Sequence, residues 1–341
     1  MTRLRGHPDR GMTGRFCEAL PAEVIQGHPI GSAILISVLD GAFLADWCHH
    51  YLGVRLECVL FRSGHLSEVV GVELVDGRRV VVKARPSDPR ITGCIAVQAH
   101  LARAGFPCPV PLTTSTQVGG LTVTAETAVP GGRQLAAEGG AAPFAALLAR
   151  LIRSAPTPAG VPKLAPSPAW TGWDHQGARL WPDRDDEGRD LNDALGPVWI
   201  DDAARRVRVR LNASAAPARI GHGDWESQNI RWSRGRPLAV HDWDSVIAQP
   251  ETAIVGLAAA VWPADGAPGE AATVGQSMDF LASYQQAAGR QWSESEIQDS
   301  WAAGLWVRLF NAKKDAADGG GPQLDRLAHQ IGGRLALAGL G

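Results

Sequence analysis

Lysine is scarce in this sequence of 341 residues: 33 residues are Lys or Arg, and only those at positions 83, 163, 313 and 314 are lysines. Acidic side chains balance the basic ones to a formal net charge of −2, so the composition indicates no nucleic-acid partner. The one basic cluster, residues 205–210, is interpreted as the solvated face of an element. At this length two lobes are expected rather than one core.

Long apolar runs are missing too, because no segment reaches the ~18 to 20 apolar residues of a membrane span. The run at 33–39 follows several arginines, as in a signal peptide, but it is short, starts late and also follows two glutamates. Residues 1–30 show no periodicity and are interpreted as a leader, either disordered or upstream of a true start at Met12. Five scattered cysteines, an odd number without metal or redox spacing, argue against a disulfide framework and favour the cytoplasm.

The most specific pattern is His-x-Asp-x4-Asn at His222, Asp224 and Asn229, followed by Asp242 13 residues after the Asn. Phosphoryl transfer needs such a spacing, with one carboxylate near a hydroxyl nucleophile while an Asn oxygen and a second carboxylate converge on magnesium. No Cys or second His stands at ligand spacing, so the ligand types disfavour zinc. A helix-capping Asp224 and a solvated loop at Asp242 would each explain one part alone. Their order and spacing together favour phosphoryl transfer.

A third element lies upstream, where Lys83 stands in a run rich in β-branched residues. Asp76-Gly77 joins this run to an earlier strand-like one, which is a strong hairpin signal. A short polar loop with Ser63 and Gly64 precedes both runs. A loop, a hairpin and a lysine on the return strand form the nucleotide-phosphate grip of kinase folds. An edge-strand lysine in water is the alternative, which the scarcity of lysine disfavours.

With these motifs the chain resembles the aminoglycoside phosphotransferase family, the kinase-like antibiotic and small-molecule kinases, over about residues 52–311. The resemblance implies that Asp224 orients or deprotonates the acceptor hydroxyl and that His222 braces the catalytic loop. It also implies that Asn229 and Asp242 hold Mg²⁺.

For the nucleotide, the same resemblance implies that Lys83 contacts the phosphates of ATP. Residues 124–132 resemble the hinge between lobes, whose backbone groups, at Glu126 and Ala128 among others, would read adenine. The single glycine of the phosphate loop fits small-molecule kinases better than protein kinases.

One departure from the family concerns the partner of Lys83, which is usually a Glu on the following helix. That helix is expected at 92–104, and no acidic residue lies between Asp88 and Glu126. We therefore expect Gln98, on one face of that helix, to replace the Glu, with its amide oxygen bonded to the Lys83 amine.

The expected fold is α+β and protein-kinase-like. A small N-terminal lobe with an antiparallel sheet would span 31–128, and a larger, mainly helical C-terminal lobe would span 131–341, with the hinge at about 125–130. Helices are expected at 42–52, 143–154, 199–211, 278–288 and 294–312, and a hairpin is expected at 230–240.

The segment 155–197 has the weakest helix signal, with many prolines, Trp170, Trp173, Trp181 and a run of acidic residues. The tryptophans and carboxylates could bind a cationic or sugar-like acceptor by stacking and ion pairing. The alternative, which we favour, is a solvated loop that its tryptophans anchor to the lobe.

The function expected from these observations is ATP-dependent phosphoryl transfer to a hydroxyl of a small molecule, with Mg²⁺ assisting. An aminoglycoside-like compound, an amino alcohol or a sugar would be the acceptor. The alternative from another class is a catalytically inactive kinase-like binding protein, which only the missing Glu supports. A glycosyltransferase reading of Asp242-x-Asp244 leaves Lys83 and Asn229 unexplained and lacks a βαβ pattern.

Overall fold

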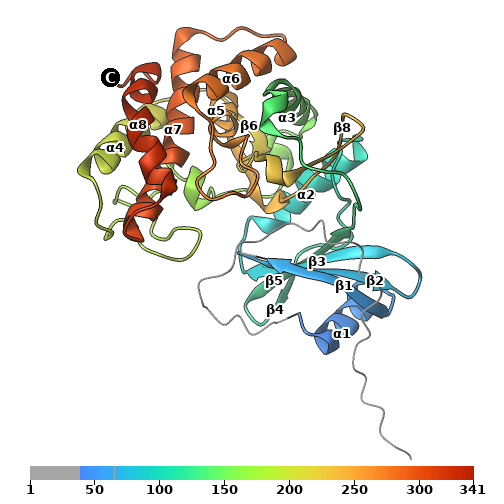
Figure 1. Cartoon of the computed structure of the whole chain (residues 1–341). Coiled ribbons are helices and arrows are strands. Elements are labelled where there is room, and N and C mark those ends of the chain that lie inside the picture. The colour runs from blue at the N-terminus through green and yellow to red at the C-terminus, as the bar shows by residue number, and fades with distance from the viewer. Residues whose placement is uncertain (1–38, 65) are drawn as a thin grey trace, which may run out of the picture.

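A computed structural model describes residues 39–64 and 66–341 (Figure 1). The expected leader at 1–30, the apolar run at 33–38 and the start at Met12 lie outside the described residues. Among the residues described, no helix is long and apolar enough to cross a membrane.

The N-terminal lobe is an antiparallel five-stranded sheet that carries one helix, α1 (Gly41–Leu52), with Asp40 as its N-cap. The strand order is β1-β2-β3-β5-β4, and the expected hairpin is present because Gly77, with a positive φ of 82°, turns β2 into β3. The strands are β1 (Leu56–Gly64), β2 (Glu68–Leu74), β3 (Arg79–Pro86), β4 (Thr116–Val118) and β5 (Leu121–Thr127). Helix α2 (Ile91–Arg103) connects β3 to β4.

The C-terminal lobe is mainly helical and stands above the sheet in Figure 1. Its helices are α3 (Ala142–Ser154), α4 (Val198–Asn212), α5 (Glu251–Val261), α6 (Val274–Ala288), α7 (Glu294–Ala317) and α8 (Pro322–Leu337). Two short antiparallel pairs complete it: β6 (Ala218–His222) with β9 (Val246–Pro250), and β7 (Ile230–Ser233) with β8 (Arg236–Val240). The α+β, kinase-like arrangement expected from the sequence is confirmed.

Helices α5 and α8 and the pair β6–β9 were not expected from the sequence. Helix α5 is buried on every side, so it shows no amphipathic period that a pattern search could find. It packs so closely on α7 that a Cβ on Gly256 would collide with the Ser300 carbonyl of that helix. Helix α7 begins at the expected capping box of Ser293 and Glu296 but runs to Ala317, beyond the expected end.

The buried apolar residues of the described chain form two separate hydrophobic cores. The first lies between α1 and the sheet and contains Trp47, Val82 and Val123. The second fills the C-terminal lobe, yet it also includes Val97 and Leu101 of α2. Helix α2 therefore precedes the hinge in the sequence but packs with the C-terminal lobe.

Candidate active site

His222 ends β6 and is fully buried, with both ring nitrogens bonded to the backbone. Its Nε2 lies 3.0 Å from the His241 carbonyl, and its Nδ1 accepts from the Asp224 amide at 3.2 Å. Burial lowers the pKa of His222 to about 4, so the ring is neutral and can accept at one nitrogen while it donates at the other. His222 thus connects the loops of Asp224 and Asp242, as expected of a bracing residue.

Asp224 and Asn229 lie at the two ends of one loop and face each other. The Asn229 Nδ2 donates to the Asp224 carbonyl at 3.1 Å and to its Oδ2 at 2.8 Å. In the described part of the chain, the Asp224 Oδ1 and the Asn229 Oδ1 accept no hydrogen bond. One carboxylate oxygen and one amide oxygen therefore remain available for substrate or cation.

Asp242 has a left-handed backbone, with φ 63° and ψ 50°, which is uncommon outside glycine and is often found at functional sites. Its Oδ2 accepts from the Ser245 hydroxyl at 2.9 Å, and a hydrogen bond joins its carboxyl to that of Asp244. Asp244 in turn pairs with Arg85 of β3 at 3.1 Å.

The carboxyls of this loop region repel one another. Burial, and then the charge of Glu226, raise the pKa of Asp224 well above its usual range. Burial and the neighbouring Asp244 do the same to the pKa of Asp242. Glu226 has its pKa raised to about 7 by burial, although the Gln228 hydrogen bond opposes this. Such a surplus of negative charge favours a cation here.

This donor set fits Mg²⁺, the ion implied by the sequence. Carboxylate and amide oxygens at Asp242 and Asn229 are hard ligands, and Mg²⁺ sites commonly use one or two protein carboxylates together with substrate phosphates. In the described chain no group of three or more His, Cys, Asp or Glu is arranged to hold a metal alone. Nucleotide phosphates would therefore have to complete the coordination.

Lys83 has a different partner from the one expected. Its amine pairs with Glu126 Oε1 of β5 at 2.8 Å, while Gln98 donates to Glu126 Oε2 at 2.9 Å and to the Pro109 carbonyl at 3.0 Å. The expectation that the Gln98 amide oxygen binds Lys83 is therefore wrong. A strand residue supplies the carboxylate, and the helix residue braces it.

One of the hinge donors expected to read adenine is already engaged. The Ala128 amide donates to the Arg79 carbonyl at 3.0 Å, so this donor is engaged in the sheet and is not available to adenine. Glu126 pairs with Val81 in the β3–β5 ladder, and its side chain points to Lys83. Adenine recognition by the backbone of this segment stays a prediction.

Ser63 and Gly64 end β1, where the chain turns into β2. Gly64 has φ 152°, and a Cβ there would collide with the Ser67 carbonyl, so the turn requires glycine. Both residues lie on the hairpin expected to cover the phosphates, and their contact with a nucleotide stays a prediction.

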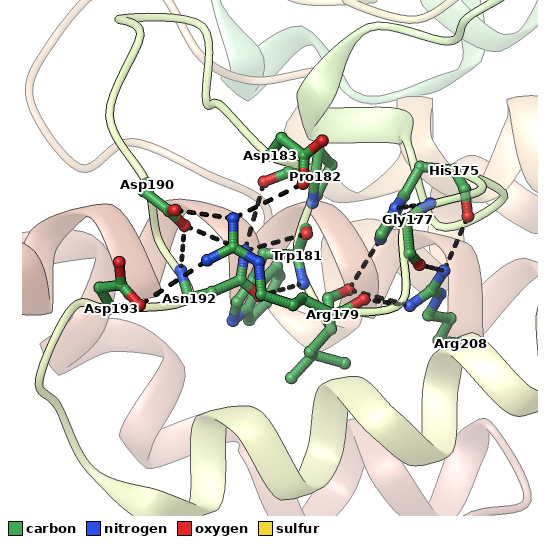
Figure 2. Close-up of polar contacts among 11 residues, drawn as sticks. His175, Gly177, Arg179, Trp181, Pro182, Asp183, Asp190, Asn192, Asp193 and Arg208 are labelled. Atoms are coloured by element: carbon green, nitrogen blue, oxygen red, sulfur yellow. Dashed lines mark hydrogen bonds and ion pairs between the residues drawn. The ribbon is translucent and has the colours of Figure 1, made fainter.

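The insert 155–197 is held by polar contacts within itself and with α4, some of which Figure 2 shows. Arg208 of α4 donates to the carbonyls of Trp173, His175 and Arg179, and Arg179 pairs with Asp190 at 2.8 Å. Trp181 is buried and donates to Asp201.

Buried Trp173 and Trp181 match the anchoring interpretation rather than the stacking one. Trp170 is only half-buried, and its Nε1 donates to the Gly223 carbonyl at 3.0 Å, so the insert contacts the loop that carries Asp224. Asp186 lies close enough to raise the pKa of Asp224, after burial, Glu226 and Asp244, and it pairs with Lys314 of α7 at 2.7 Å.

Pattern reasoning missed two arginines that join the lobes. Arg85 follows Lys83 by two positions and so shares its face of β3, a signal that strand alternation could have supplied. Arg90 is buried and donates to the carbonyls of Leu164, Asp244 and Val246, which no local pattern could reveal.

Comparisons with known proteins agree with this architecture. A model of the phosphotransferase enzyme family (APH) matches residues 57–305. A search of curated protein sequences found no match. Among solved structures, amicoumacin kinase in complex with AMP-PNP, Ca²⁺ and Ami is similar with a TM-score of 0.57 at 12% identity, covering 82% of this chain and 86% of that one.

Two other solved structures are similar at comparable levels. A thermostable mutant of aminoglycoside phosphotransferase APH(4)-Ia with AMP-PNP and hygromycin B has a TM-score of 0.57 at 16% identity, covering 86% of this chain and 97% of that one. Spectinomycin phosphotransferase APH(9)-Ia with ADP and spectinomycin has a TM-score of 0.51 at 12% identity, covering 85% and 92%. At such identities the likeness establishes the fold.

Proposed function

Because the chain belongs to the phosphotransferase enzyme family and has its kinase-like fold, we propose that it transfers the γ-phosphate of ATP to a hydroxyl group of a small molecule. The observation that carries this proposal is the meeting of Asp224, Asn229 and Asp242 opposite Lys83. The charges of Asp244 and Asp242 both raise the pKa of Lys83. The sheet residues around Lys83 and the loops of Asp224 and Asp242 therefore form the two sides of one cleft.

Asp224 is assigned the role of general base. Its Oδ2 is held by Asn229, which leaves Oδ1 to accept the hydrogen of an acceptor hydroxyl. The raised pKa of Asp224 makes it a better proton acceptor than an ordinary carboxylate. His222 fixes the amide of Asp224 and acts as a positioning residue, because neither ring nitrogen is free to reach a substrate.

Lys83 would hold nucleotide phosphates from the sheet, as a fixed positive charge beside Glu126. Asn229 and Asp242 would hold Mg²⁺, which when bound neutralises phosphate charge. The protein contributes alignment of the hydroxyl with the phosphorus and charge that is arranged before the reaction starts.

The carboxylates near Asp224 indicate an acceptor that carries amino groups. Glu226 raises the pKa of Asp224, and in the described chain it accepts only from the Gln228 amide and has no cationic partner. Asp186 also raises that pKa, but it is already paired with Lys314. A protonated amine beside the reacting hydroxyl would relieve this repulsion. Amino sugars and amino alcohols therefore fit this side of the cleft better than neutral sugars or acids.

A panel of acceptors tests this function. We expect acceptor-dependent ADP release from MgATP with at least one hydroxylated amine, and little release with the matched compound in which a hydroxyl replaces the amine. Absence of turnover with every acceptor, although MgATP binds, would instead favour an inactive kinase-like binding protein. The presence of Asp224, Asn229, Asp242 and Lys83 supports the active enzyme over that alternative.

A further inference from the structure

The Lys83 ion pair lies within a single sheet. Lys83 and Thr124 are directly opposite in the β3–β5 ladder, so Glu126 is two positions along β5 on the same face. The two side chains meet at 2.8 Å and are only 13% and 9% exposed. No helix has to be in place for this contact to form.

Glu126 is held firmly from its other oxygen. Gln98 donates to Oε2 at 2.9 Å, and the same amide nitrogen donates to the Pro109 carbonyl at 3.0 Å. Two acceptors around one NH2 group fix the orientation of the amide. The neutral Gln98 therefore completes the hydrogen bonding of the carboxylate without adding charge.

Helix α2 is attached to the other lobe. Its buried residues Val97 and Leu101 belong to the C-terminal core, whereas Val82 and Ala125, the sequence neighbours of Lys83 and Glu126, belong to the sheet core. Arg90, just before α2, donates to carbonyls at Asp244 and Val246. A carboxylate on α2 would have tied Lys83 to the C-terminal lobe.

From this arrangement we infer that Glu126 positions Lys83 for the nucleotide phosphates in place of a carboxylate on α2, so that the phosphate grip is complete within the sheet. The inference rests on the proposed function. It assigns Glu126 a positioning role through Lys83, and it assigns Gln98 the role of bracing Glu126. A shift of α2 relative to the sheet would then cost the Gln98 bond but leave the Lys83 ion pair intact.

The electrostatics agree with the geometry. Burial alone would lower the pKa of Lys83, but Glu126 and then Asp244 more than offset it. Burial would raise the pKa of Glu126, and the charge of Lys83 outweighs that effect. The groups facing Lys83 are Glu126 from β5, Arg85 from its own strand, and Asp242 and Asp244 from the C-terminal lobe.

A relocation of the charge provides the test. MgATP affinity is measured by calorimetry, and kcat and KM for ATP in the steady state, for Glu126→Gln, Gln98→Glu and the double variant Gln98→Glu/Glu126→Gln. We expect Glu126→Gln to weaken MgATP binding by roughly tenfold or more, because a buried lysine loses its only close counter-charge within the sheet. KM for ATP should rise more than kcat falls.

The double variant moves the carboxylate from position 126 on β5 to position 98 on α2, whose side chain contacts that of residue 126. We expect it to recover most of the lost MgATP affinity, while the unpaired Pro109 carbonyl lowers Tm. Gln98→Glu alone sets a second carboxylate against Glu126 and should destabilise the fold without tightening MgATP. Glu73→Gln is the matched control, since Glu73 pairs with Arg79 on the exposed part of the same sheet.

Two results would overturn the inference. One is a folded Glu126→Gln protein that binds MgATP within twofold of the wild type. The other is a double variant that folds and binds no better than Glu126→Gln, which would give Glu126 a structural role only. If Glu126→Gln does not fold, Glu126→Asp is compared instead, with the same expected rise in KM. Wild-type protein that binds no MgATP would contradict the proposed function itself.

Discussion

The two sides of the cleft differ in how their charges are balanced. On the sheet side, Lys83 meets Glu126 and Arg85 meets Asp244, so each cation has a carboxylate within 3.1 Å. On the loop side, Asp224 and Glu226 have no cationic partner in the described chain and touch only amides. The first side is arranged before any ligand binds. The second side carries a repulsion that a cation and an amino-bearing acceptor would relieve.

Removing the carboxylate of Asp224, the assigned base on the loop side, should have the largest effect on turnover. Asp224→Ala is expected to lower kcat by on the order of 10² or more, because it removes the carboxylate oxygen that is assigned to accept the proton of the acceptor hydroxyl. MgATP affinity should stay nearly unchanged, since Lys83 and Asp242 remain. Turnover is measured as acceptor-dependent ADP release, with Asp279→Ala on the exposed face of α6 as control. Near-normal turnover in folded Asp224→Ala would contradict the assignment.

The Mg²⁺ dependence of ATP binding should depend on Asp242 and Asn229. We expect Asp242→Ala to weaken Mg²⁺-dependent ATP binding by about tenfold or more, and Asn229→Ala to weaken it less, because only Asp242 carries a charge. Calorimetry with and without Mg²⁺ separates the metal-dependent part. If both variants keep the wild-type Mg²⁺ dependence, the metal is bound elsewhere. Binding of metal-free ATP should change little, which distinguishes this effect from misfolding.

The repulsion on the loop side should also be visible as pH-dependent stability. The pKa of Glu226 is raised from the ordinary 4.5 to about 7, so the folded protein binds this proton more tightly than the unfolded chain does. The stability of the fold therefore falls as the pH rises from about 4.5 to about 7. Glu226→Gln should therefore raise Tm at pH 8 by on the order of 2–5 °C and leave it unchanged at pH 4.

Mg²⁺ with a nucleotide should reduce the Tm difference between Glu226→Gln and the wild type, because the cation offsets the same charge. The exposed Glu138, changed to Gln, serves as the control for a lost surface charge. An equal gain in Tm at both pH values would show that the repulsion is not its cause.

The smallest expected effect concerns the insert 155–197 and tests whether it affects the kinetics of the acceptor without affecting those of ATP. Trp170→Phe removes the hydrogen bond to the Gly223 carbonyl but keeps the ring, a loss of about 1 kcal/mol of loop stabilisation. We expect kcat/KM for the acceptor to fall about two- to fivefold while KM for ATP is unchanged. A change in KM for ATP instead would mean that the insert also supports the sheet side.

Local patterns were sufficient to predict that Asp224, Asn229 and Asp242 lie close together, because they fall within 19 residues, the span of a loop and one hairpin. The Lys83 hairpin was equally local. The partner of Lys83 could not be predicted locally, because Glu126 lies 43 positions later and reaches Lys83 only through the register of the β3–β5 pair. Helix α5 was missed for the opposite reason: complete burial removes the polar face by which helices are detected.

Arg90 has a consequence for synthesis of the chain on the ribosome. Its guanidinium is buried, and its acceptor at Asp244 comes 154 positions later in the sequence. At about 5–20 residues per second, this acceptor is made roughly 8 to 30 s after the arginine. Over that interval the core of the C-terminal lobe, which the apolar face of α2 joins, is still incomplete, because it also includes residues of α5, α6 and α7 that follow Asp244. We therefore expect the sheet and α1 to fold first. Residues 88–106 would stay unpacked and accessible to chaperones until the second half of the protein is made.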